Sequence, residues 1–194
     1  MLYDILKFVH VISFAFMSIP LFNLIAVNER AKFGTGLNYY ADQYMENIIR
    51  GGVKRCYVFQ SSVLLSGILL LLYGPLGIEA LYTNWILLVK TVLLFALMGS
   101  LSYVHLYLQP KIDVPLAALK PYTPIPDETA KQIKPYRVRR KKLAANCLFF
   151  VITIIIFGMQ VYSTYSLTTN IVLILLAALF SWRAYKTLLQ YGWV

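Results

Sequence analysis

The sequence has few of the residues from which a soluble metal site or a disulfide framework is built. It contains two histidines and two cysteines, and the spacing of Cys56 and Cys147 fits no metal motif. Only 13% of its residues are charged, whereas an ordinary soluble domain has about 25%. No phosphate-binding loop, zinc signature or Ser-His-Asp set can be assembled, and nucleic acid is not an expected partner.

Apolar residues make up 59% of the 194 positions and occur in long uninterrupted runs, which require a lipid solvent. We therefore predict an all-α transmembrane helix bundle that forms one domain over residues 1–194, with the lipid bilayer as its first partner. The predicted spans are about 5–27, 57–76, 85–108, 146–165 and 170–191. The last run is short, so four spans are the alternative to the five that we prefer.

Lysine and arginine are unevenly distributed between the predicted connections, and the net charge is +10. The connection between the second and third spans has none, whereas those after the first and third spans have many. Because basic loops stay in the cytoplasm, the N-terminus is expected outside. For a bacterial protein this means the inner (plasma) membrane with a periplasmic N-terminus. Five spans also place Arg183 and Lys186 on the cytoplasmic side.

Two of the predicted connections have structure-forming patterns of their own. Residues 35–52 have aromatic and aliphatic residues at helical spacing, which suggests an interfacial helix along the cytoplasmic face. Residues 110–143 form a basic cytoplasmic loop. We expect its proline-rich first half to be extended and its second half, from Asp127, to be a short helix.

Ionisable residues inside a span are costly and are therefore candidates for function. The predicted spans contain His10, Lys90 and His105. At about 1.5 Å per residue, His10 and Lys90 lie roughly 9–10 Å outward from the middle of their parallel helices, in one layer. His105 lies near the cytoplasmic end of the third span. His10 is thus a candidate haem ligand with Lys90 nearby, and His105 is a candidate ligand for a second haem.

Each of these residues also has an ordinary structural interpretation. His10 is one turn from Ser13 and can simply form a hydrogen bond inside the bundle. Lys90 can extend its ammonium group to the interface. His105 lies between Tyr103 and Tyr107, in a region where polar side-chain tips are common.

Three segments resemble the HemJ and CopD-like membrane proteins, over roughly residues 1 to 160. The first, KFVHVISFAFMSIPLFNL, resembles their opening helix with its histidine, here His10. The second, NWILLVKTVLLFALMGSLSYVH, resembles their pattern of tryptophan, lysine and histidine, here Trp85, Lys90 and His105. The third, RRKKLAANCLFF, resembles their arginine-rich approach to an asparagine, here Asn146.

The resemblance implies a membrane bundle that binds haem b or another porphyrin, with the first-helix histidine and the third-helix lysine important. CopD relatives imply copper handling instead. The leading hypothesis is therefore a haem- or porphyrin-associated protein in redox chemistry and electron transfer, working with quinone, other membrane subunits or a second copy of itself. The alternatives are a cofactor-free accessory subunit of a respiratory or photosynthetic complex, a copper transport or resistance protein, and a protoporphyrinogen oxidase.

Overall fold

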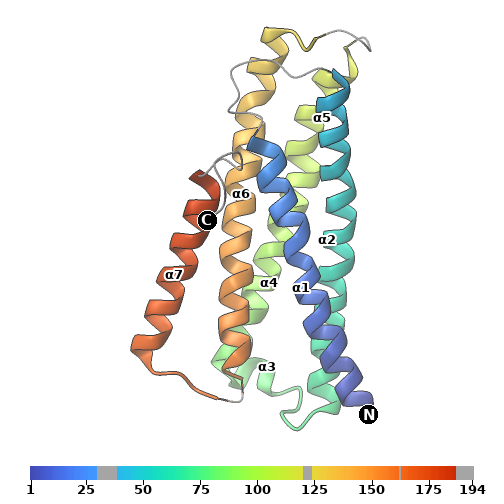
Figure 1. Ribbon diagram of the computed structural model, residues 1–194. Coiled ribbons are helices and arrows are strands. Elements are labelled where there is room, and N and C mark those ends of the chain that lie inside the picture. Colours follow the sequence, from blue (N-terminus) through green and yellow to red (C-terminus); the bar gives the residue numbers. More distant parts are fainter. Residues whose placement is uncertain (30–38, 120–123, 162, 187–194) are drawn as a thin grey trace.

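A computed structural model describes residues 1–29, 39–119, 124–161 and 163–186. The described part of the chain is helical and contains no strand, so the predicted all-α class is confirmed. In chain order, the elements are α1 (Leu2–Asn28), α2 (Tyr39–Tyr73), α3 (Ala80–Thr83), α4 (Trp85–Tyr103), the π-helix η2 (Val104–Leu108), α5 (Gln109–Ala117), α6 (Asp127–Met159) and α7 (Leu167–Lys186) (Figure 1).

Five helices in the described residues are long and apolar enough to cross a membrane, with α4, η2 and α5 counted as one. This confirms the predicted bundle and its preferred number of spans. Large apolar side chains on its outer surface, including Phe8 and Leu65, are more than 60% exposed. Such a surface needs hydrocarbon around it. The fourth helix ends at Met159, earlier than predicted, and residues 187–191 of the predicted fifth span lie outside the described residues.

Three of the helices are longer than a membrane requires. At about 1.5 Å per residue, helices of 33 to 35 residues extend about 50 Å, while the hydrocarbon core is about 30 Å thick. The surplus of α2, α5 and α6 lies at one end, where α1 also ends (Figure 1). We call this end, which holds residues 39–56, 109–117 and 127–142, the charged end. The N-terminus and α3 lie at the opposite end.

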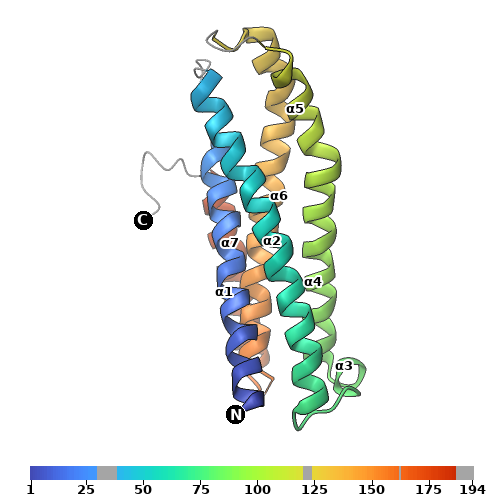
Figure 2. The same ribbon diagram turned by 90° about the vertical axis from the view of Figure 1, so that its right-hand side faces the viewer.

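Residues 39–52 do not form a separate interfacial helix. They are the first turns of α2 and continue in line with its membrane span, and residues 35–38 lie outside the described part (Figure 2). The reason is that Asp42 and Glu46 are buried against basic side chains of α6. Ion pairs across the bundle therefore hold this segment in line with the span of α2. The predicted orientation along the cytoplasmic face was wrong.

The first part of the proline-rich segment after the third span, up to Ala117, is helical and not extended as predicted, whereas residues 124–126 lie outside any helix and residues 120–123 lie outside the described part. Pro110 lies in the first turn of α5, directly after the π-helix η2, in which the N–H of Gln109 bonds to the carbonyl of Val104. A π-turn is wider than an α-turn and gives the pyrrolidine ring space. The expected helix from Asp127 is confirmed, and it runs without a break into the fourth span as α6.

The core lies where α1, α2, α4 and α6 meet (Figures 1 and 2). Met17, Leu97 and Val151 are at most 1% exposed there. By contrast, α7 lies at the edge of the bundle and packs chiefly on α6 (Figure 1). Its buried residues are small, Ala177, Ser181 and Ala184, and small residues allow close helix approach in a membrane.

Candidate functional site

His10 is held against α2 by a hydrogen bond and by a glycine. Its Nδ1 lies 3.0 Å from the Ser66 hydroxyl, and a Cβ on Gly67 would lie 3.3 Å from its Cε1. The Ser66 hydroxyl donates its single hydrogen to the Ser62 carbonyl at 2.5 Å, so toward His10 it can only accept. With the ring hydrogen on Nδ1, the tautomer that this arrangement favours, the lone pair of Nε2 is left for another partner.

Lys90 approaches the same region from α4. Its side chain is half-buried, and a Cβ on Gly158 of α6 would lie 3.5 Å from its Nζ. Its positive charge acts on the His10 ring, so the two residues lie within electrostatic range of each other. Among the described residues, Lys90 has no carboxylate or hydrogen-bond partner. An unpaired ammonium group within electrostatic range of a neutral imidazole can attract an anionic, metal-containing ligand.

His105 does not join this pair. It lies in η2, toward the charged end, and its side chain is exposed. Its ring meets the edge of the Tyr57 ring at a centroid distance of 6.0 Å and an angle of 74°. The suggested second haem site therefore has His105 as its only predicted ligand. Within the described residues, no group of three or more His, Cys, Asp or Glu side chains could hold a metal ion.

The donor set of the His10 region fits one axial position of a haem. Ligating histidines usually donate their other ring N–H to an oxygen, and the Ser66 hydroxyl offers such an oxygen 3.0 Å from Nδ1 of His10. Gly67 and Gly158 let the His10 ring and the Lys90 side chain pack close to the backbones of α2 and α6. Met17, on the same face of α1, is fully buried in the core, and a sixth ligand from the described residues is not evident.

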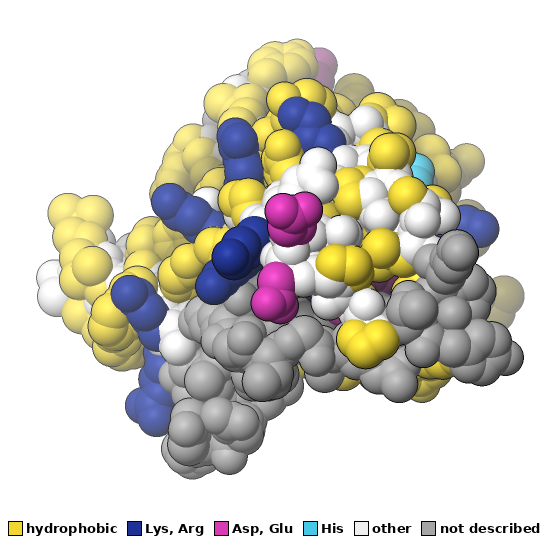
Figure 3. Space-filling model, turned by 90° about the horizontal axis from the view of Figure 1, so that it is seen from above, with side chains coloured by type: hydrophobic (Ala, Val, Ile, Leu, Met, Phe, Trp, Pro, Cys, Tyr) yellow, Lys and Arg dark blue, Asp and Glu magenta, His cyan; other side chains and the backbone are white. Residues whose placement is uncertain are grey.

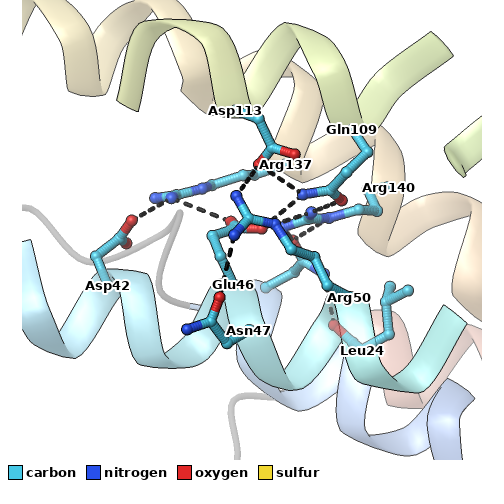
Figure 4. Close-up of polar contacts among 10 residues, drawn as sticks. Leu24, Asp42, Glu46, Asn47, Arg50, Gln109, Asp113, Arg137 and Arg140 are labelled. Carbon is cyan, nitrogen blue, oxygen red and sulfur yellow. Dashed lines mark hydrogen bonds and ion pairs between the residues drawn. The ribbon is translucent and has the colours of Figure 1, made fainter. Parts of the chain in front are cut away.

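The charged end contains a buried ionic network that we did not predict (Figure 4). Arg140 is fully buried and donates all five of its guanidinium N–H groups to three side chains: Asn28, Glu46 and Gln109. Arg137 pairs with Asp42 at 2.5 Å and with Glu46 at 3.1 Å. These contacts join α1, α2, α5 and α6 at the level where α1 ends.

Two further ion pairs extend the network, one of them buried and the other partly exposed. Lys141 pairs with Glu29 at 3.2 Å, and both are buried. The Arg50 guanidinium donates a hydrogen bond to the Asp113 carboxylate at 2.7 Å. This bond raises the pKa of Arg50. The network thus pairs four cations with four carboxylates, a neutral combination that tolerates burial.

The sequence contained a signal for the network that composition did not show. Asp42 and Glu46 are four residues apart on α2, and Arg137, Arg140 and Lys141 have spacings of three and four on α6. These spacings place each set on one helix face. Only after both segments are known to be helical do the two faces become recognisable as partners.

A small cavity lies below Arg140, inside the membrane-spanning part. It has a volume of about 30 Å³, and its lining includes Met17, Cys56, Gln60, Ser100 and Cys147. The Oε1 atom of Gln60 is buried without a hydrogen-bond partner. Both cysteines are buried and free. The cavity is large enough for a water molecule or a single ion.

Comparisons with protein-family models, curated proteins and solved structures found no match to this chain. The fold and the sites therefore define its class, an integral membrane protein built as an all-α helix bundle.

Proposed function

We propose that this protein binds haem b or another porphyrin at His10 and takes part in redox chemistry and electron transfer in the membrane. The observation that carries the proposal is the hydrogen bond between His10 and Ser66. With the ring hydrogen on Nδ1, this bond leaves Nε2 for iron. A neutral imidazole with this arrangement is a typical axial ligand.

Lys90 has the second role in this proposal. Haem carries two propionate carboxylates, and a half-buried ammonium without a protein partner in the described residues offers them a counter-charge. The pairing would orient the porphyrin between α1 and α4 and would lower the cost of a buried charge. A bound haem supplies one-electron chemistry, which makes a quinone or another membrane subunit the expected electron partner.

The topology belongs to the same proposal. With the charged end in the cytoplasm, the N-terminus and His10 lie toward the outside, which in a bacterial inner membrane is the periplasmic side. The haem would then occupy the outer leaflet. A sixth ligand from a partner subunit or a second copy would make the protein a component of a larger complex.

A visible spectrum of the purified full chain, expressed with ample haem, tests the proposal. We expect a Soret band and a reduced-minus-oxidised α band that disappear in His10→Ala and persist in His105→Ala. The second variant is a matched control, because it removes the other histidine, which is exposed. A wild-type protein without these bands would refute the proposal. Bands that survive in His10→Ala would assign the haem to another ligand.

Copper(I) handling is the second candidate, because the small cavity has three sulfur atoms in its lining. Met17, Cys56 and Cys147 come from three different helices, and thiolate and thioether ligands favour copper(I). Competition with a chromophoric copper(I) chelator tests this function. Cys56→Ser should weaken binding, whereas Met98→Leu, which changes a methionine outside the cavity lining, should leave it unchanged. Equal affinities in the two variants would exclude the cavity as a copper site.

A further inference from the structure

The basic residues of α6 fall into two sets that face opposite ways. Arg137, Arg140 and Lys141 are buried and paired with carboxylates of α2 and with Glu29, which directly follows α1. The remaining four are exposed, and within the described residues none has a carboxylate partner: Lys131, Lys134, Arg139 and Lys142. Seen from the charged end, basic side chains are accordingly spread over the surface and acidic ones are few (Figure 3). The exposed set is available for an anion from outside the bundle.

Two stacked tyrosines each contact a cation, one from this exposed set on α6 and the other from α5. The Arg139 guanidinium lies 5.3 Å from the centroid of the Tyr103 ring. Tyr103 stacks on Tyr107 with a centroid distance of 5.2 Å and an interplanar angle of 23°. Lys111 lies over the other ring, with its Nζ 3.9 Å from the centroid of Tyr107. We call these four residues the tyrosine–cation cluster.

The Tyr107 hydroxyl contacts one cation of the cluster and lies within electrostatic range of the other. It accepts a hydrogen bond from Lys111 at 2.7 Å, and the charges of Lys111 and Arg139 both act on it. Because this oxygen already accepts from Lys111, its own hydrogen remains for another acceptor. Two cations and one hydroxyl donor on neighbouring helices suit a phosphate, which offers several acceptor oxygens.

The cluster lies where the apolar part of the bundle ends. Leu106, between the two tyrosines in sequence, is 72% exposed, and the apolar run of α6 begins at Leu143, one turn beyond Arg139. Tyrosine and basic side chains are typical of this level, where lipid headgroups lie. Lys134 lies about 7 Å farther from the apolar run along α6 than Arg139, at a rise of about 1.5 Å per residue.

We infer that Lys111, Arg139 and the Tyr107 hydroxyl bind the phosphate of an anionic phospholipid at the charged end of the bundle. The headgroup should carry no cation of its own, since an ammonium would compete with Lys111 and Arg139 for the phosphate charge. The acyl chains would lie along the exposed apolar surface near Leu106. The inference depends neither on a haem nor on the orientation of the protein in the membrane.

Native mass spectrometry of the full chain in detergent tests it, with phosphatidylglycerol or phosphatidylcholine added as the probe. We expect phosphatidylglycerol to be retained preferentially. The double variant Lys111→Gln/Arg139→Gln should lose this affinity by about tenfold or more, given the usual contribution of basic residues to lipid binding. The matched control is Lys131→Gln/Lys134→Gln, which removes the same charge from the exposed part of α6 above the cluster and should retain most of the affinity.

Three results would overturn the inference. Equal losses in the two double variants would show diffuse attraction without a site. Equal retention of the two lipids by the wild-type protein would show that the site does not select lipids by the charge of the headgroup. Displacement of the lipid by inorganic phosphate at the same concentration would assign the cluster to a soluble anion.

Single variants keep the test valid if the cluster double variant fails to fold. Tyr107→Phe retains the aromatic ring and removes only the hydroxyl, so it should lower the affinity less than the double variant does. Arg139→Gln changes an exposed side chain and should unfold at the wild-type temperature. If neither single variant lowers the affinity for phosphatidylglycerol, the inference is wrong.

Discussion

Arg140 and Glu46 form a two-point ion pair inside the protein, with Nη1 2.9 Å from Oε2 and Nη2 2.9 Å from Oε1. Both side chains are at most 1% exposed. The remaining N–H groups of the guanidinium bond to Asn28 and Gln109. One pair of residues, 94 positions apart in the sequence, therefore connects the first turns of α2 to α6 at the charged end.

We predict that Glu46→Gln destabilises the fold by about 3–5 kcal/mol, because it leaves the buried positive charge of Arg140 without its carboxylate. Unfolding of the purified protein in mixed micelles measures the change. Asp113→Asn is the matched control. Its pair with Arg50 is partly exposed, at 30% and 45%, so the loss should stay below about 1 kcal/mol. Similar losses in the two variants would contradict a special role for the buried pair.

The membrane-spanning part of this fold could be predicted from the sequence because lipid imposes a simple pattern. Uninterrupted apolar runs such as those in α2 and α6 need no knowledge of their neighbours. The charged end could not be predicted in the same way. The first turns of α2, before Lys54, depend on the ion pair between Glu46 and Arg140. This contact joins residues that are far apart in the chain.

Prolines misled the prediction for another reason. Pro110 and Pro115 suggested an extended segment, but the π-helix η2 ahead of Pro110 lets the chain continue as a helix. A single sequence contains no clear signal for a π-turn. For the candidate site, the shared layer of His10 and Lys90 was predicted from helix rise alone. The partner Ser66 was not, since it lies on another helix.

Ser66→Ala should weaken haem binding by about tenfold, because residues that orient a ligating histidine commonly contribute 10- to 100-fold to affinity. Without the Ser66 hydroxyl, no side chain among the described residues holds the ring hydrogen of His10 on Nδ1. Haem titration of the apoprotein measures the change. Ser18→Ala is a suitable control, since among the described residues that hydroxyl bonds only to the carbonyl of Ala15 in its own helix. An unchanged affinity in Ser66→Ala would mean that the tautomer of His10 is set in another way.

Replacement of two glycines of α2 by alanine should change the stability of the fold in opposite directions. At Gly67, the new methyl group would lie 3.3 Å from Cε1 of His10, so the ring must shift, and we expect a loss of about 1 kcal/mol. At Gly51, no atom of the described residues lies within 4 Å, and the helix should gain up to about 1 kcal/mol. Unfolding in mixed micelles compares the two variants with the wild type. Stabilisation by Gly67→Ala would show that His10 does not pack there.

The proposed orientation can be tested with single cysteines at the two ends of the bundle. Glu79 and Lys131 are both exposed and lie at opposite ends, and the native cysteines are buried, so the wild-type protein serves as the background control. In intact bacterial cells, a membrane-impermeant maleimide should label Glu79→Cys and not Lys131→Cys. After permeabilisation it should label both. The physical reason is that the basic loops resist transfer across the membrane, whereas the connection between α2 and α4 has no lysine or arginine. Labelling of Lys131→Cys alone in intact cells would reverse the orientation and move His10 to the cytoplasmic side of the bilayer.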